Sequence, residues 1–124
     1  WRDTHVTAAI TPQYSNSKIL LFSRIYIYGN NTSGEMYFGL DYRRNISGGA
    51  DTTNISGETA QSVAQHRSIG NGELADIYNH NAIDTPNTTS ATTYTLRIGG
   101  QGSANTIWGW QGMEDTLVIM EVKV

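Results

Sequence analysis

The sequence is short of several features that define common classes of protein. It has no cysteine among its 124 residues, which excludes a disulfide framework and thiolate metal ligands. Charged residues make up only 15%, with 8 basic and 11 acidic residues mixed along the chain, so no basic stripe is available to neutralise phosphates. No apolar run approaches the roughly 18 residues that cross a bilayer. We therefore expect neither nucleic-acid binding nor membrane insertion.

Uncharged polar residues supply most of the polarity that is present. Asn, Gln, Ser, Thr and Gly accompany 38% hydrophobic and 10% aromatic residues. The 13 glycines and 2 prolines favour short strands joined by turns, because glycine weakens helix interiors and supplies positive φ angles. The length fits a single domain, residues 1–124. Because the chain opens on Trp1 rather than methionine, we expect it to be a fragment or a processed product of a longer protein.

The clearest predicted strand spans residues 18–29, which are rich in β-branched and aromatic residues and end in a Gly-Asn-Asn turn signal. Successive side chains of a strand point to opposite faces. One face fits a domain core and holds Ile19, Leu21, Ser23, Ile25 and Ile27. The other face holds Leu20, Phe22, Arg24, Tyr26 and Tyr28, a composition that fits contact with another subunit or with a ligand.

Further alternating or β-rich segments predict five more strands, at residues 5–10, 35–43, 93–98, 106–111 and 116–124. In residues 35–43 the predicted buried side holds Met36, Phe38, Leu40 and Tyr42. The Thr-rich run at residues 84–98 begins as a turn and becomes a strand at Thr93. Six or seven strands with closely spaced turns predict an all-β fold, an antiparallel β-sandwich of jelly-roll-like type.

In the middle of the chain the sequence pattern fits more than one secondary structure. Residues 45–57 repeat Asn-Ile-Ser and fit either a long surface excursion or a repeated turn, whereas residues 58–66 fit one or two helical turns. Residues 73–83 fit a short helix or an extended segment. In a helix, Asp76 and His80 would pair on one turn; the alternative is that both are ordinary surface polar residues.

Two strands are apolar on both faces, which predicts an oligomer. In residues 116–124, Leu117 and Ile119 lie on one face while four apolar residues lie on the other, and both faces need burial. The predicted subunit interface consists of Arg24, Tyr26, Tyr28, Val118, Met120 and Val122.

Two aromatic and two amide side chains are candidates for contact with a glycan. Trp108 and Trp110 flank a glycine on one side of a predicted strand and suit stacking on sugar rings; the alternative is that they pack against a neighbouring subunit or cover an edge of the core. Asn45 and Asn54 lie in one of three polar loops, residues 30–34, 45–57 and 99–105, that we expect to face outward. Amides and hydroxyls exchange hydrogen bonds with sugar hydroxyls at low desolvation cost.

No residue pattern predicts catalysis, a metal or a cofactor. His5, His66 and His80 lack metal-ligand spacing. Six carboxylates offer pairs for glycoside hydrolysis, Asp41, Asp51, Glu58, Glu73, Asp76 and Asp84, but enzymes that cleave polysaccharide capsules are usually much larger than this chain. We expect the protein not to be an enzyme.

Three segments carry a family resemblance: Thr11-Pro12 with Ser17-Lys18-Ile19-Leu20, then Ser90 with Thr93-Tyr94, then Met120-Glu121. In this order and spacing they resemble the C-terminal domains of tail-fibre and virion structural proteins of marine bacteriophages. The match covers both ends of the chain and leaves residues 30–83 unmatched.

The resemblance implies a homotrimeric fibre tip or head appendage on the virion, which attaches to a host-cell polysaccharide or protein receptor and contacts other virion proteins. The alternative is a capsid decoration or a fibre-capping and trimerisation domain that binds no receptor.

Overall fold

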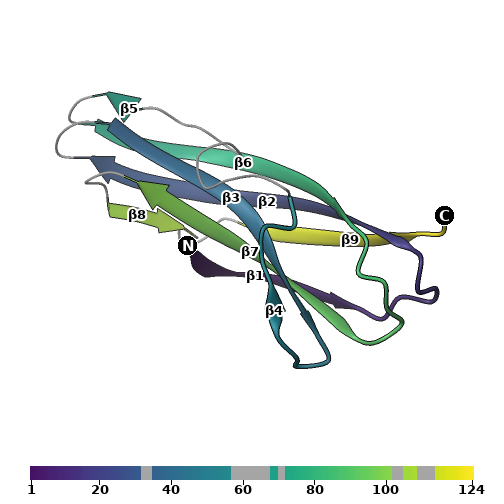
Figure 1. Cartoon of the computed structure of the whole chain (residues 1–124). Coiled ribbons are helices and arrows are strands. Elements are labelled where there is room, and N and C mark those ends of the chain that lie inside the picture. The colour runs from purple at the N-terminus through teal and green to yellow at the C-terminus, as the bar shows by residue number, and fades with distance from the viewer. Residues whose placement is uncertain (32–34, 57–67, 70–71, 102–104, 109–113) are drawn as a thin grey trace.

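The computed structural model describes residues 1–31, 35–56, 68–69, 72–101, 105–108 and 114–124, and this part of the chain contains strands and no helix (Figure 1). The strands are β1 (Arg2–Ile10), β2 (Lys18–Asn31), β3 (Glu35–Ile46), β4 (Asp51–Thr52), β5 (Ser68–Ile69), β6 (Gly72–Asp84), β7 (Thr92–Gln101), β8 (Asn105–Trp108) and β9 (Thr116–Val122). The predicted all-β class is confirmed.

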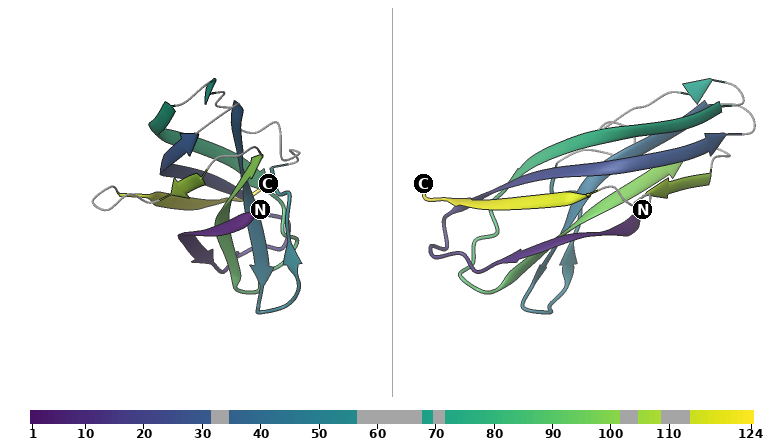
Figure 2. Two further views of the ribbon diagram at one scale, coloured as in Figure 1. Left: turned by 90° about the vertical axis from the view of Figure 1, so that its left-hand side faces the viewer. Right: turned by 180° about the vertical axis from the view of Figure 1, so that it is seen from behind.

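The strands form two antiparallel sheets that pack against each other as a β-sandwich (Figure 2). The first sheet has the order β1-β7-β3-β4, with β5 also paired to β3. The second sheet has β2 at its centre, β6 along one edge, and β8 and β9 along the other. The chain changes sheet between β1, β2 and β3 and again between β6, β7 and β8, as it does in jelly rolls.

Alternating side chains of the central strands fill the space between the sheets. The predicted core face is confirmed for β2 and, at Phe38, Leu40 and Tyr42, for β3, whereas the side chain of Met36 lies outside the described residues. The fully buried members are Ile19, Leu21, Ile25, Ile27, Phe38, Leu40, Tyr42, Tyr94 and Leu96, each 0–1% exposed. Burial of each such side chain contributes about 1.5–3 kcal/mol. Each chain therefore has a complete core of its own.

Polar groups that cross this core are paired. The Tyr42 hydroxyl, from β3, lies 2.8 Å from Ser23 Oγ of β2 and 2.7 Å from the His80 carbonyl oxygen of β6. Nearer the end of the sandwich, the Tyr94 hydroxyl donates to Asp84 Oδ2 at 2.7 Å, and Arg44 binds the same carboxylate at 2.7 and 2.8 Å. These contacts fix how the two sheets sit on each other.

Two of the segments whose sequence left alternatives open contain strands. Residues 73–83 belong to β6, which pairs with β2 along its length, so the helical alternative is wrong. In a strand, residues four apart are separated by about 13 Å, and Asp76 and His80 do not pair: Asp76 is exposed, whereas His80 is buried and stacked on Tyr42. Residues 45–57 are not a single excursion, since β3 extends to Ile46 and β4 follows. Residues 58–66 lie outside the described residues.

Strands β8 and β9 run in line along one edge of β2. Trp108 pairs with Ile27 and Thr116 pairs with Arg24, so among the described residues no strand partner lies opposite Ile25 and Tyr26 on this edge. The Asp115 carboxylate, 1% exposed, accepts the backbone N–H of Tyr26 at 2.8 Å. The side chain thus satisfies a backbone donor of β2.

Candidate functional site

The candidate site is the outward-facing side of the second sheet, the side that points away from the core. The register places three rows of side chains next to one another across β6, β2 and β9. We call this surface the outer face; its apolar members are Ile77 and Ile83 of β6, Leu20, Phe22, Tyr26 and Tyr28 of β2, and Val118, Met120 and Val122 of β9.

Much of this apolar surface is open to solvent in a single chain. Ile83 is 60% exposed, Val118 54%, Met120 52% and Phe22 41%. With their apolar neighbours they expose on the order of 500 Å² of apolar surface, at the upper end of the ~300–600 Å² of the largest patch on a typical monomer. Since about 65% of a homodimer interface is apolar and a standard interface buries about 800 Å² per partner, the outer face is large enough to hold a subunit contact.

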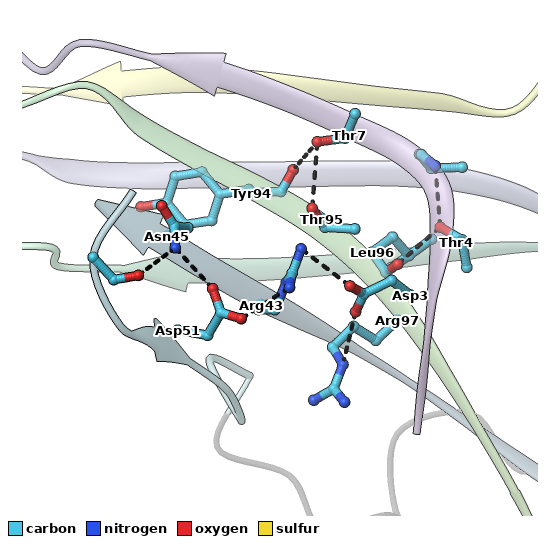
Figure 3. Close-up of polar contacts among 12 residues, drawn as sticks. Asp3, Thr4, Thr7, Arg43, Asn45, Asp51, Tyr94, Thr95, Leu96 and Arg97 are labelled. Carbon is cyan, nitrogen blue, oxygen red and sulfur yellow. Dashed lines mark hydrogen bonds and ion pairs between the residues drawn. The ribbon is translucent and has the colours of Figure 1, made fainter. Parts of the chain in front are cut away.

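The opposite surface, on the outside of the first sheet, has a different chemistry. Asp3 lies 3.0 Å from Arg43 and 3.2 Å from Arg97, and Arg43 also binds Asp51 at 2.9 Å (Figure 3). Beside them Thr7 Oγ1 donates to the Tyr94 carbonyl oxygen at 2.9 Å. Paired charges and hydroxyls suit a surface in water. The sandwich therefore has one hydrated side and one apolar side.

The six residues predicted as a subunit interface all map to the outer face. Arg24, Tyr26 and Tyr28 lie on β2, and Val118, Met120 and Val122 lie on the neighbouring β9. The sequence reasoning missed Ile77 and Ile83, which complete the surface on the β6 side. Their alternation with the inward residues of β6 was the available signal, but it is readable only once residues 73–83 are known to be a strand.

The four predicted glycan-binding residues are not brought together. Trp108 belongs to β8, whose partner residues in β2 are near the end of that strand, whereas Asn45 lies by the turn between β3 and β4 at the opposite end of the sandwich (Figure 1). Trp110 lies outside the described residues. Asn54 is exposed in the segment that follows β4.

Both asparagines take part in local structure. Asn45 Nδ2 donates to Gly49 O at 2.7 Å and to Asp51 Oδ1 at 2.8 Å, and its Oδ1 accepts the Gly48 N–H at 2.8 Å. The hydrogen bond from Asn45 lowers the pKa of Asp51, and Arg43 adds to that effect. Asn54 has a left-handed φ of 62°, and its N–H donates to Asp41 Oδ2 at 2.7 Å. The amide of Asn45 is thus committed to the turn.

One cluster resembles catalytic chemistry in composition but not in geometry. Ser56 Oγ donates to Asp41 Oδ1 at 3.0 Å and lies 2.9 Å from His80 Nε2. In a serine-histidine-aspartate triad the acid binds the histidine, whereas Asp41 here binds the serine hydroxyl and two backbone N–H groups of residues 54 and 56. The cluster anchors residues 53–56 onto β3 and β6. Within the described residues no group of three His, Asp or Glu side chains is placed to hold a metal ion.

The fold and this surface define a class: a β-sandwich domain with an apolar outer face. No family model, curated protein or solved structure matches the chain. Among the described residues no helix is long and apolar enough to span a membrane.

Proposed function

We propose that this domain is a self-assembling module of a phage virion fibre or capsid appendage, in which copies pack through the outer face as a homotrimer. The exposed apolar surface of β6, β2 and β9 carries the proposal. Its burial lowers the free energy by about 25 cal/mol per Å² of apolar area. The virion setting and the number of copies come from the resemblance of residues 10–21, 84–98 and 116–124.

A single substitution on the outer face tests this assignment. Val118→Asp places a charge in the middle of the apolar surface, where burial against another copy would leave it unpaired. Because Val118 is 54% exposed, the chain should still fold, while its mass in solution should fall from that of a trimer to that of one chain. Light scattering coupled to size exclusion measures both masses, and circular dichroism reports the fold.

The matched control is Ala9→Asp, which adds the same charge to an exposed position of an edge strand of the first sheet. It should leave the mass unchanged. A wild-type chain that is monomeric at high concentration would refute the proposal, as would a Val118→Asp variant that assembles like the wild type.

Adhesion to a host receptor is the second candidate. One observation favours it: Trp1, 43% exposed on the hydrated side, lies flat against Gly99, where an added Cβ would come within 2.8 Å of the indole ring. Arg97 lies 5.7 Å from the ring centroid. A flat, supported indole beside a cation suits stacking on a sugar ring. Glycan-array binding separates an adhesion module from a purely structural one.

A further inference from the structure

Among the described arginines, Arg2 and Arg24 have no side-chain partner, and of these two Arg24 lies on the outer face. Arg43, Arg44 and Arg97 each bind an aspartate at 2.7–3.2 Å. Arg24 is exposed on the outer face and forms no ion pair or hydrogen bond through its side chain within the described part of the chain. Its charge therefore remains available.

In an assembly, an unpaired charge at the position of Arg24 would make the contact between copies less favourable. The register sets Asn79 and Thr116 on either side of it, and Phe22 and Tyr26 precede and follow it on the same face. If another copy covers the outer face, Arg24 is removed from water near the centre of the contact. A buried charge needs an opposite charge and further hydrogen bonds, or the contact becomes unfavourable.

Most acidic side chains of the second sheet are already engaged within the chain. Asp76 accepts the N–H of Ile77, Asp84 binds Arg44 and Tyr94, Asp115 binds Tyr26, and Glu121 accepts the N–H groups of Gln13 and Tyr14. Among the acidic residues whose side chains the structure describes, Glu114 is the exception. It is exposed, has no partner, and begins the alternation of exposed and half-buried residues that continues through β9.

Glu114 precedes Thr116, the residue paired with Arg24, by two positions, which is the spacing of side chains on one face of a strand. An unused cation on the outer face and an unused anion next to the start of β9 do not bind each other within the chain. In a symmetric assembly every contact between two positions recurs in each copy. We propose, on the basis of the assembly proposed above, that Arg24 of one copy binds Glu114 of the next and that this ion pair sets the register in which the copies pack.

Charge reversal tests the pair. Arg24→Glu and Glu114→Arg should each weaken association by about 30-fold or more, because like charges then meet in a desolvated contact. The double variant, Arg24→Glu with Glu114→Arg, should restore association. Lys18→Glu is the matched control: it makes the same change on the same face, opposite Val122, but outside the proposed pair, and should change association far less. Sedimentation velocity measures association, and circular dichroism checks folding.

Mixing Arg24→Glu chains with Glu114→Arg chains reports the number of copies in one assembly. Favourable contacts then occur only between unlike chains, which can alternate around a ring of even number but not around a ring of three. A trimer predicts that the double variant assembles and the mixture forms no trimers. Dimers or tetramers in the mixture would support the ion pair and refute the trimer.

Two results would overturn the ion pair. If the double variant associates as weakly as the single variants, Arg24 and Glu114 do not meet. If the single variants associate like the wild type, their charges lie outside the contact. Should Val118→Asp still yield single chains in either case, the proposed assembly stands and only the ion pair fails. A monomeric wild type would refute both.

Discussion

Tyr42 is a buried residue that makes the stability of the folded chain depend on pH. Burial raises its pKa from 10.0 to about 12. The folded chain therefore keeps the phenol proton at a pH where the unfolded chain has lost it. The stability that this proton contributes is complete below pH 10 and is lost as the pH rises toward 12, at about 1.4 kcal/mol per pH unit.

We expect Tyr42→Phe to lose less stability than the wild type between pH 9 and pH 11. At pH 8 the variant should be less stable by about 1 kcal/mol, since hydrogen bonds are lost but Ser23 Oγ still donates to the His80 carbonyl oxygen at 3.0 Å. Urea unfolding at the three pH values measures the difference. Equal losses in both proteins on going to pH 11 would contradict the assignment.

At the scale of residues, the sequence predicts burial better than pairing. The alternation in residues 18–27 identifies Ile19, Leu21, Ile25 and Ile27 as core, and all four are buried. It does not identify the partners of Asp41 or Asp115, because these come from segments 13 to 15 and 89 positions away. Such contacts depend on how the strands are stacked, which one-dimensional periodicity does not encode.

The turn between β3 and β4 has a left-handed backbone at a residue type that adopts this conformation at a cost. Ser47 and Gly48 have φ of 51° and 74°, and the Gly49 N–H donates to Ile46 O at 2.9 Å, so both central residues of the turn are left-handed. Glycine adopts this conformation freely, whereas serine does so at a cost. Asparagine tolerates it better.

Ser47→Asn should therefore stabilise the domain by about 0.5–1 kcal/mol, and Ser47→Val should destabilise it by about 1–2 kcal/mol. Ser47 is exposed, so neither change disturbs packing. Thermal unfolding of the Val118→Asp background measures both effects on the folded chain apart from assembly. A valine variant as stable as the asparagine variant would show that the turn tolerates either side chain.

At the scale of elements, strands with clear alternation were predictable and β6 was not. Residues 73–83 contain Leu74, Ile77 and Tyr78 at helical spacing, and too few apolar residues follow to decide. Pairing with β2 decides in favour of a strand, because β2 has an edge that needs backbone partners. The part of the outer face that β6 supplies, Ile77 and Ile83, was hidden by this ambiguity.

The molecule as a whole couples two kinds of stability: a core that each chain completes alone and a surface that requires a neighbour. Assembly removes folded chains from the unfolding equilibrium, so the melting temperature should rise with protein concentration. We expect a rise of several degrees over a hundredfold range for the wild type, and none for Val118→Asp. Differential scanning fluorimetry measures this, and parallel behaviour of the two proteins would contradict it.

The edge of β2 that pairs with β8 and β9 has a consequence for how this fold tolerates change in length. Its register is fixed at two separate points, by Trp108 with Ile27 and by Thr116 with Arg24, and between them Asp115 accepts the N–H of Tyr26. Extra residues placed between these two anchor points need not shift either half of the edge. Variants of this scaffold can thus differ in the size of that connection while keeping the same sandwich.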